Sequence, residues 1–397
     1  MNRRTPVIVS AVRTPIGKFG GTLAGMPAVE LGAAAIKGAV DRVGVDPYRI
    51  DEVLMGQVVQ AGSGQSPARQ AALKAGLPAD HIPATTVNKI CGSGLKTMMM
   101  AAAMIKAGDG DLFVAGGMES MNQCPYLLRK GRTGYRLGHD TLYDALVHDG
   151  LWCAFEDHHM GNSAEWVAKE YNLTRQELDE YAHESQRKAL AAREAGRFEA
   201  EIVPVMVPQR RGDPLRFDRD EVIRPETTLE TLAKLRPAFR RDGMVTAGNA
   251  PGITDGAAAT VVMALETAEE LGIEPIAAIT GYAQAGVKPL EIFTAPIFAV
   301  RKLMALTGAV IDHYDLIEAN EAFAAQCLAD GRALGWDWDR VNVNGGAIAL
   351  GHPIGCSGTR IVVTLLHALL ERGLKTGMAT LCLGGGEAVA MSVEMMR

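Results

Sequence analysis

The chain has 397 residues, of which 48% are hydrophobic and 22% charged, with 44 glycines and 18 prolines. This composition is typical of a soluble globular protein of two or three domains, and it excludes a disordered, collagenous or disulfide-stapled chain. Lys and Arg number 40 against 46 Asp and Glu, which gives a formal net charge of -6. No overall basic field therefore attracts nucleic acid or anionic membranes, and an anionic ligand needs a local group of basic residues.

The N-terminal residues show no apolar signal core, and the chain contains no run of about 18 uncharged apolar residues. There are six cysteines, and they form neither a CxxC pair nor a Cys/His cluster at zinc spacing. We therefore expect a cytoplasmic protein with free thiols and no metal site. Each cysteine is then either part of a hydrophobic core or a reactive group, and only its local sequence can distinguish the two.

In chain order, the first part of the sequence alternates between apolar, β-rich runs and Ala-rich helical segments. The expected strands cover 7–12, 52–59, 84–90 and 112–115, and the expected helices cover 28–43, 66–75 and 95–107. Strands that alternate with helices favour parallel sheets covered by helices, so the fold class is α/β.

Residues 119–248 differ in character, being charged, aromatic and interrupted by proline. They contain one clear amphipathic helix over 174–195, which begins with a capping box from Thr174 to Glu177. Alternation resumes near Asp255. We expect helices over 257–265, 266–271, 298–308, 321–334 and 359–373, strands over 277–284, 316–320 and 379–385, and a strand followed by a loop over 341–355.

A weak internal repeat relates the two ends of the chain. The sequence CGSG at 91–94, the helix after it and residues 111–119 resemble CSG at 356–358, the helix after it and residues 379–387. We therefore expect two related halves, residues 1–118 plus 249–272 and residues 273–397. Residues 119–248 would be inserted between them as a loop domain.

Cys91 is a candidate nucleophile because it lies between an expected strand and an expected buried helix. At a helix N-terminus the free N–H groups favour the thiolate, which lowers a thiol pKa from about 8.5. The glycines beside it allow the backbone to approach a substrate carbonyl closely. The alternative is a packed cysteine in a glycine-rich turn.

His352 and Asn320 are two further candidates in loops next to helices. His352 follows Gly351 in a Gly/Pro-rich loop, where an imidazole could accept a proton from a thiol at neutral pH, although an isolated loop histidine is often a surface residue. Asn320 ends an expected strand before a helix. It can be an N-cap, or its amide can face developing negative charge, and these two roles are compatible.

Cys382 ends an expected buried strand and precedes Gly384, Gly385 and Gly386. A thiol packed in a strand is one interpretation. The other is an active-site thiol beside consecutive N–H groups that can receive an oxyanion. The glycine-rich segment at 243–252 predicts only a loop that enters a small-residue helix.

Taken together, nine segments in order resemble the thiolase family over essentially the whole chain. They are SAVRTPIGKFGG, NKICGSG, GGMESM, HMGNSAE, KLRPAF, VTAGNAPGITDGAAA, EANEAFA, NGGAIALGHPIGCSG and CLGGG. The resemblance implies a five-layered α-β-α-β-α fold, with the inserted residues forming a lid-like loop domain over the coenzyme A (CoA) channel. It also implies a homodimer or homotetramer that acts in fatty acid metabolism, with residues 123–138 as an assembly loop or an ordinary exposed loop.

The function that the resemblance implies is acyl-CoA C-acyltransfer, with acetyl-CoA and acetoacetyl-CoA as the expected substrates. Cys91 would take the acyl group as a thioester while His352 accepts its proton, and a second acyl-CoA would then enter in ping-pong order. Cys382 would remove the α-proton of the second substrate. Asn320 with His352, through a water, would hold the enolate oxygen, and the N–H groups of Cys91 and Gly384 would hold the acyl oxygen.

The resemblance further implies that CoA is a substrate and product, that no cofactor is bound permanently, and that no metal takes part. The matching positions for CoA contacts are His159, Met160, Arg224, Ala247, Gly248 and Pro251. Arg224 is one of five arginines in the inserted segment that could hold the nucleotide phosphates, and each of them could equally be a solvated loop charge.

The chain departs from the usual family pattern at several positions. Pro251 stands where the family commonly has a serine, and proline offers neither a hydroxyl nor an N–H group. Residues 291–296 replace a glycine-containing acyl-pocket segment with bulkier side chains, and Glu387 replaces a common glutamine. Two other functions remain open: a ketoacyl synthase-like condensing enzyme, which needs no second thiol, and a non-catalytic acyl-CoA binding protein on the same scaffold.

Overall fold

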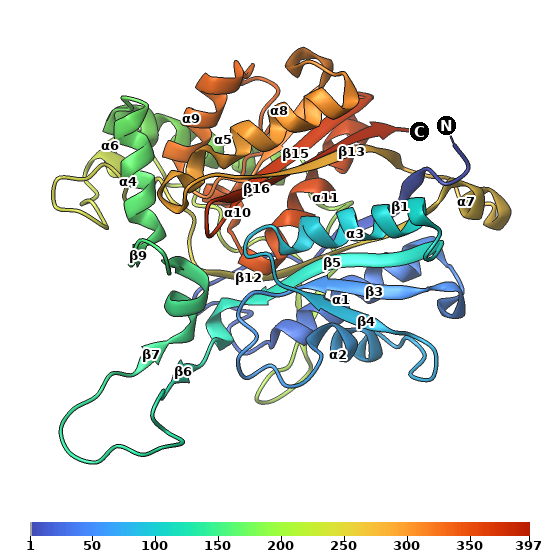
Figure 1. The fold of residues 1–397 in the computed structure, drawn as a ribbon, viewed down its shortest axis with the longest axis horizontal. Coiled ribbons are helices and arrows are strands. Elements are labelled where there is room, and N and C mark those ends of the chain that lie inside the picture. Colours follow the sequence, from blue (N-terminus) through green and yellow to red (C-terminus); the bar gives the residue numbers. More distant parts are fainter. Residues whose placement is uncertain (1) are drawn as a thin grey trace.

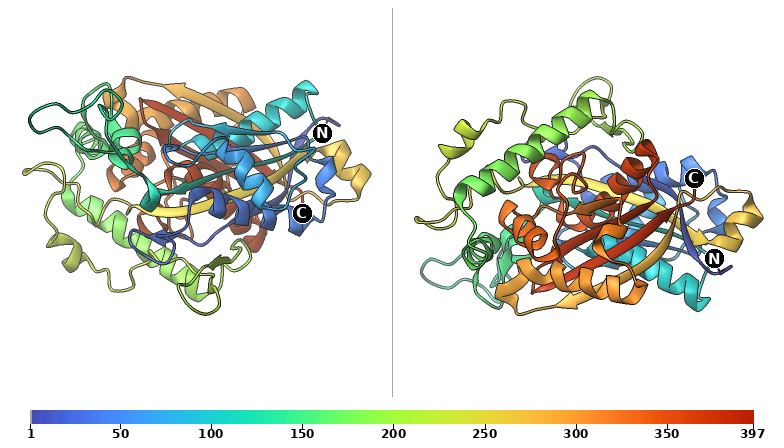
Figure 2. Two further views of the ribbon diagram at one scale, coloured as in Figure 1. Left: turned by 90° about the horizontal axis from the view of Figure 1, so that it is seen from below. Right: turned by 90° about the horizontal axis from the view of Figure 1, so that it is seen from above.

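The computed structural model describes residues 2–397 (Figures 1 and 2). Ten strands form one continuous sheet with two parts, which meet where β1 pairs briefly with β13. The first part runs in the order β1 (Pro6–Arg13), β12 (Thr254–Ala264), β5 (Leu112–Ser120), β3 (Glu52–Gly56) and β4 (Ala84–Val87), with β2 (Gly17–Lys18) beside β12. The second part runs in the order β13 (Ala277–Gly286), β16 (Glu387–Met395), β15 (Thr376–Leu383) and β14 (Leu316–Ala319).

Helices cover both faces of each part, which gives five layers (Figure 1). The central layer consists of α3 (Ser93–Ala107) and α11 (Ile354–Arg372), which contact each other and strands of both parts. The outer layers are α1 (Ala28–Val43) and α2 (Pro67–Lys74) on the first part, and α8 (Ala295–Thr307) with α9 (Ala324–Leu334) on the second. The expected α-β-α-β-α fold is thereby confirmed.

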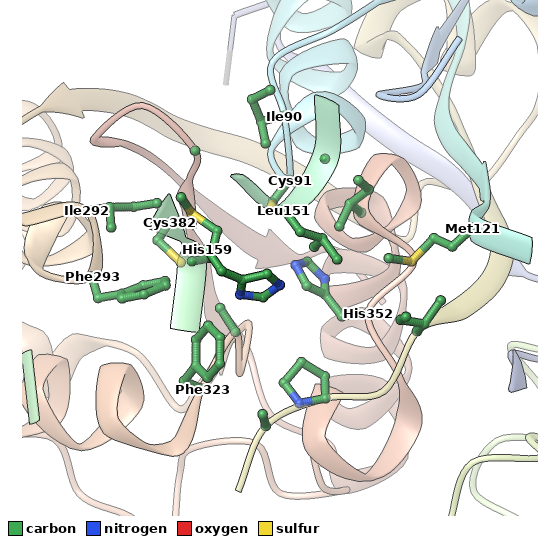
Figure 3. Close-up of a pocket in the computed structure, with 18 of the residues that line it drawn as sticks. Ile90, Cys91, Met121, Leu151, His159, Ile292, Phe293, Phe323, His352 and Cys382 are labelled. Atoms are coloured by element: carbon green, nitrogen blue, oxygen red, sulfur yellow. The ribbon is translucent and has the colours of Figure 1, made fainter. Parts of the chain in front are cut away.

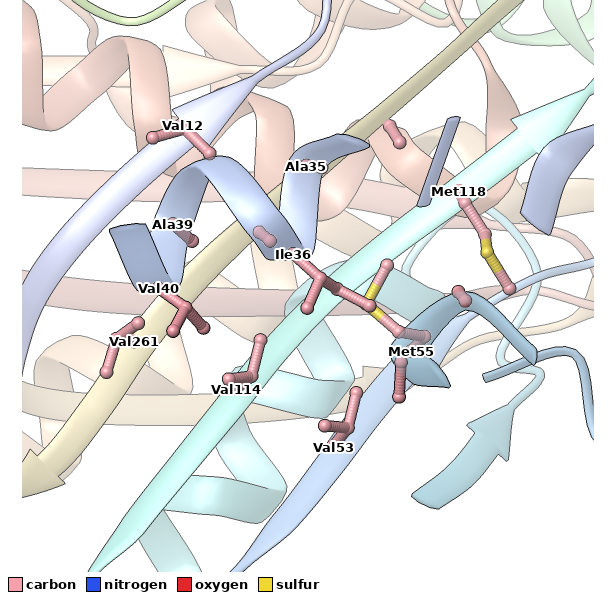
Figure 4. Packing of buried hydrophobic residues seen from close by; sticks show 14 of the residues in the cluster. Val12, Ala35, Ile36, Ala39, Val40, Val53, Met55, Val114, Met118 and Val261 are labelled. Carbon is pink, nitrogen blue, oxygen red and sulfur yellow. The ribbon is translucent and has the colours of Figure 1, made fainter. Parts of the chain in front are cut away.

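The outer core of the first part shows why α1 forms where the sequence predicts it. Ala35, Ile36, Ala39 and Val40 recur at helical spacing and are buried against the sheet (Figure 4). A second core fills the space between the two parts of the sheet with apolar residues of α3 and α11. The buried apolar area on both faces fixes the position of the two central helices, which carry the site.

The glycines of the sequence repeat allow α3 and α11 to pack closely. A Cβ added at Gly358 would lie 2.4 Å from the backbone nitrogen of Leu95, and one added at Gly94 would lie 2.9 Å from the nitrogen of Thr359. Any larger residue at either position would force the helices apart. The repeat thus identifies the contact that brings the N-terminal ends of α3 and α11 together.

Residues 119–248 contain short strand pairs and three helices. The helices are α4 (Met160–Glu170), α5 (Arg175–Glu194) and α6 (Leu229–Ala233), and the strand pairs are β6 (Tyr126–Leu127) with β7 (Tyr143–Asp144), β8 (Trp152–Cys153) with β9 (His158–His159), and β10 (Val205–Val207) with β11 (Leu215–Phe217). The predicted capping box at the start of α5 is present. The β6–β7 segment projects away from the body of the protein (Figure 1).

The helix expected over 257–265 was wrong, because residues 257–264 belong to the strand β12. Thr260, Val261 and Val262 are β-branched, and the strand lies between β1 and β5 with every residue buried. A strand that is buried on both faces reads as a continuous apolar run, which a short sequence window cannot distinguish from a buried helix. The following helix is present as α7 (Leu265–Leu271).

The remaining elements are short. They are α10 (Ala347–Leu350), η1 (Pro47–Arg49), η2 (Met121–Gln123), η3 (Leu146–Leu151), η4 (Pro289–Thr294) and η5 (Ile311–His313). Among the described helices, α11 alone combines the length and hydropathy of a membrane span, and 83% of its most apolar window is buried inside the protein.

Candidate active site

A cavity of about 110 Å³ lies where the N-terminal ends of α3 and α11 meet the end of β15 (Figure 3). Cys91, His352, Cys382 and Gly384 all line it, although they come from three distant segments of the sequence. The rest of the lining is mostly apolar and comes from several elements: Ile90, Met121, Gly150, Leu151, His159, Met160, Phe239, Ala250, Pro251, Gly252, Ile253, Ile292, Phe293, Ala322, Phe323 and Ile354. The two sulfur atoms therefore share one apolar space with an imidazole.

Cys91 lies in a tight turn between β4 and α3. Ile90, directly before it, has a φ of +46°, which a β-branched residue rarely adopts. Ser93 stabilises this turn, because its Oγ donates to the carbonyl of Ile90 at 2.6 Å and accepts the N–H of Lys89 at 2.8 Å. Backbone strain of this kind persists only where the surroundings hold it, and here it presents the Cys91 side chain to the cavity.

The Cys91 thiol is not activated in the way that its position next to a helix predicts. Burial raises its pKa to about 12, although the backbone N–H groups of Cys91 and Gly384 act in the opposite direction. The expectation of a lowered pKa was therefore wrong, since desolvation of the thiolate outweighs the helix N-terminus. The resting nucleophile is a neutral thiol that must lose its proton as it attacks.

His352 lies directly before α11 and is buried. Burial, together with the positive charge of Arg360, lowers its pKa to about 3, so the ring is neutral. Nδ1 lies 2.6 Å from the Oγ of Ser357, and that hydroxyl donates its hydrogen to the carbonyl of Pro353 at 3.0 Å. Ser357 Oγ can then only accept from His352, which assigns the ring proton to Nδ1 and leaves Nε2 as the free acceptor.

Asn320 is fully buried beside His352, with its side-chain nitrogen 3.5 Å from His352 Nδ1. Its Oδ1 has no hydrogen-bond partner among the described residues. The N-cap interpretation was wrong, because α9 begins at Ala324 and Phe323 occupies the cap position. A buried amide oxygen without a partner is costly in a core, which indicates that the amide serves another group, such as a water or a substrate.

Cys382 is buried near the end of the strand β15, just before the glycine-rich turn. Burial raises its pKa well above the ordinary value, and the proximity of Cys91 and Asp330 adds to the effect. The mutual influence of the two thiols is consistent with their shared cavity. A base of high pKa is a strong proton acceptor once it has been deprotonated.

The residues expected to contact CoA fall into two groups. His159, Met160 and Pro251 line the cavity, and the His159 ring stacks on Phe239 with centroids 4.7 Å apart. Arg224, Ala247 and Gly248 lie outside its lining. The backbone N–H of Arg224 donates to Gln186 Oε1, and Gly248 is buried beside Leu232 and Leu235.

Two residues of the site were not singled out from the sequence. Ser357 orients His352. The only sequence signal for this role is the position of Ser357, five residues after the histidine and near the start of a helix. Glu119 is fully buried, and its two side-chain oxygens accept the backbone N–H groups of Val58, Val59 and Gly355. It thereby links the end of β5 to the start of α11, and the only sequence signal for it is an acidic residue inside an otherwise apolar strand.

A five-layered α/β fold that gathers a cysteine, a histidine and a second cysteine in one apolar cavity has the features of a cysteine-dependent acyl-transfer enzyme. Residues 6–266 match the family described as "Thiolase, N-terminal domain", and residues 273–395 match "Thiolase, C-terminal domain". The protein belongs to the thiolase family, as its sequence motifs predict.

Several relatives resemble the chain over nearly its whole length. Two curated proteins named acetyl-CoA acetyltransferase, from Pseudomonas aeruginosa and Escherichia coli, are 56% and 55% identical to it. Each alignment covers 98% of this chain, and it covers 98% and 99% of the respective relative. A crystal structure titled Bacillus anthracis acetyl-CoA acetyltransferase superposes with a TM-score of 0.97 at 44% identity and covers 99% of both chains.

Proposed function

We propose that the protein is an acetyl-CoA C-acetyltransferase that condenses two acetyl-CoA molecules or, in reverse, cleaves acetoacetyl-CoA with CoA. The observation that carries this proposal is the convergence of Cys91, Cys382 and His352 on one cavity. The names of the relatives at about 55% identity support the choice of acetyl-CoA as the substrate.

In the first step Cys91 attacks the thioester carbonyl while Nε2 of His352 accepts the thiol proton. The CoA sulfur leaves and takes that proton, so the acetyl group stays on Cys91 and the imidazole is neutral again. The N–H groups of Cys91 and Gly384, two residues that line the cavity, stabilise the carbonyl oxygen as negative charge develops.

In the second step Cys382 acts as the base toward a second acetyl-CoA. Its thiol proton passes to His352, and the resulting thiolate removes the α-proton of the substrate. The imidazolium N–H and, through a water, the amide of Asn320 stabilise the enolate oxygen. The enolate attacks the acetyl group on Cys91, and the released Cys91 thiolate regains a proton from His352.

The two alternative functions make different demands on the site. A ketoacyl synthase-like enzyme needs no second thiol, and a non-catalytic binding protein needs no nucleophile. Cys382 lines the cavity together with Cys91, His352 and Gly384, which favours the thiolase reaction over both alternatives.

CoA binding and assembly are further parts of the proposal. His159, Met160 and Pro251 would contact the pantetheine arm and the acyl group, and Arg224, Ala247 and Gly248 would lie along the outer part of the bound CoA. CoA would act as substrate and product of a cytoplasmic enzyme of fatty acid metabolism, with no permanently bound cofactor.

We propose a homodimer or homotetramer, in which residues 123–138 form an assembly contact. This segment belongs to the projecting β6–β7 region and carries Leu128 and Leu137, whose exposed fractions are 59% and 102% (Figure 1). Exposed leucines on a projecting segment are typical of a surface that another subunit covers.

The experiment that tests the proposed function is a thiolysis assay with 3-ketoacyl-CoA substrates of increasing length, including 2-methyl-branched ones. We expect acetoacetyl-CoA to be cleaved with ping-pong kinetics and with the highest kcat/KM of the series. Absence of thiolysis for every substrate, with the protein folded, would contradict the proposal.

A further inference from the structure

The acyl-oxygen site proposed above is assembled from two turns that belong to different halves of the chain. The Cys91 N–H comes from the turn between β4 and α3, and the Gly384 N–H comes from the turn between β15 and β16. Two donors can share one oxygen only if the distance between the two turns is fixed. What fixes it is therefore part of the catalytic machinery.

Apolar contacts provide part of the connection between the turns. A Cβ added at Gly92 would lie 2.3 Å from Leu383 Cδ2, and one added at Gly384 would lie 3.1 Å from Ile90 Cγ2. The side chains of Leu383 and Ile90 therefore each rest on a glycine of the opposite turn. Such contacts press the turns together but do not set their register, since dispersion attraction has no direction.

An ion pair adds a directional link at the same place. Nζ of Lys89 lies 2.8 Å from both Oε1 and Oε2 of Glu387. The Lys89 side chain is 18% exposed and that of Glu387 is 46% exposed. Lys96, a neighbouring cation, instead points its Nζ at Gln284 Oε1, 3.4 Å away, so it does not compete for the carboxylate.

Each partner of the pair is anchored rigidly to its own turn. The N–H of Lys89 donates to Ser93 Oγ, and its carbonyl accepts the N–H of Gly92 at 3.1 Å. Glu387 is the first residue of β16 and pairs with Leu383 and Gly286 in the sheet. The pair thus joins a point two residues before Cys91 to a point three residues after Gly384.

We propose that Lys89 and Glu387 are positioning residues, which hold the two N–H donors of the acyl-oxygen site at the spacing that acylation of Cys91 requires. This inference rests on the proposed role of these N–H groups in the thiolase reaction. It also gives a role to Glu387.

The test compares acylation of Cys91 by acetyl-CoA with alkylation of Cys91 by iodoacetamide. Acylation develops charge on a carbonyl oxygen, whereas alkylation by displacement of iodide does not. We expect Lys89→Met and Glu387→Gln each to lower the ratio of the two rates about three- to tenfold. The double variant should match the single ones, because both substitutions remove the same interaction.

Controls separate this role from a general loss of stability. Lys74→Met removes an exposed ion pair of similar length between Lys74 of α2 and Glu30 of α1, and it should leave the ratio unchanged. High salt should weaken the Lys89–Glu387 pair, because it is partly exposed. In the wild type at saturating acetyl-CoA, high salt should therefore also lower the ratio of acylation to alkylation.

Two results would overturn the inference: a ratio that does not change in Lys89→Met and Glu387→Gln, or effects of these substitutions that add in the double variant. If the wild type itself forms no acetyl-enzyme, the proposed function fails, and this outcome is distinct from failure of the positioning role.

Discussion

At the scale of single residues, the arrangement around His352 determines how the proposed reaction begins. The thiol and the imidazole are both neutral at rest, since burial raises the pKa of Cys91 to about 12 and lowers that of His352 to about 3. Proton transfer must then accompany attack, and the imidazole must present its free nitrogen to Cys91. The contact between Nδ1 and Ser357 Oγ provides this orientation.

Replacement of Ser357 by alanine should therefore slow acylation of Cys91. We expect a loss of about three- to tenfold in the acylation rate, because the ring loses the acceptor that selects its tautomer. Pre-steady-state formation of acetyl-enzyme measures this, and Ser357→Thr, which keeps a hydroxyl, should retain most of the rate. An alanine variant that acylates at the wild-type rate would show that Ser357 does not orient the ring.

Residue identity was predictable where the chemistry is local. Cys91, His352 and Cys382 stand within two residues of a glycine at expected strand or helix ends, and the cavity brings all three together. The pKa of Cys91 was not predictable, because it depends on burial by residues distant in the sequence. The partner of His352 also required the structure, since it is fixed by the first turn of α11.

At the scale of elements, the segment η4 limits the acyl side of the cavity. Its Phe293 is buried, lines the cavity and packs edge-on against Phe323, with ring centroids 5.2 Å apart (Figure 3). A wall built from two interlocked aromatic rings favours a short acyl chain.

Phe293→Ala should therefore shift the substrate preference toward longer chains. We expect the kcat/KM for a six-carbon 3-ketoacyl-CoA, relative to acetoacetyl-CoA, to rise about tenfold or more, since each accommodated methylene is worth about 1–3 kcal/mol. Phe298→Ala is the control, because Phe298 is 47% exposed on α8 and should not alter the preference. An unchanged ratio in a folded Phe293→Ala variant would remove Phe293 from the specificity wall.

The elements themselves were predictable to different degrees. The amphipathic helices α1 and α5 appear where their periodicity and capping residues predict them. β12 was mistaken for a helix because it is buried on both faces, which removes the alternation that identifies a strand. The start of α9 was placed too early, since Asn320 resembles an N-cap but instead lies beside His352.

At the scale of the whole molecule, the site depends on contacts between the two halves of the chain. Glu119 contributes one of these, because a side-chain oxygen of this residue accepts the N–H of Gly355 at the start of α11. Burial raises the pKa of Glu119 to about 8, and that of Glu318 to about 8 as well, although Arg360 opposes the shift of Glu318. Both groups are protonated in the folded protein near neutral pH and ionised in the unfolded chain.

These shifts predict that the folded state becomes less stable as the pH rises. Each acid binds a proton in the folded state that it loses on unfolding, so stability decreases from the ordinary carboxyl pKa up to about 8. The lowered pKa of His352 acts in the opposite direction, but only below its ordinary value of 6.5. The decrease in stability should therefore be clearest between about pH 6.5 and 8.

Thermal unfolding of the protein measures this dependence. We expect Tm to fall across this pH range, and to fall less steeply in Glu119→Gln. Each buried acid with a raised pKa changes the free energy of unfolding by on the order of 1 kcal/mol per pH unit. A Tm that rises with pH, or an identical slope in the variant, would contradict the protonated state of Glu119.

The proposed roles of Cys91 as the nucleophile and Cys382 as the base are tested most directly by two parallel measurements. Mass spectrometry after incubation with acetyl-CoA detects the acetyl-enzyme, and a condensation assay detects acetoacetyl-CoA. Wild type and Cys382→Ala should both carry one acetyl group, on Cys91, while Cys91→Ala carries none. Only the wild type should produce acetoacetyl-CoA at a substantial rate. Undiminished condensation by Cys382→Ala, or an acetyl group bound to a residue other than Cys91, would contradict the mechanism.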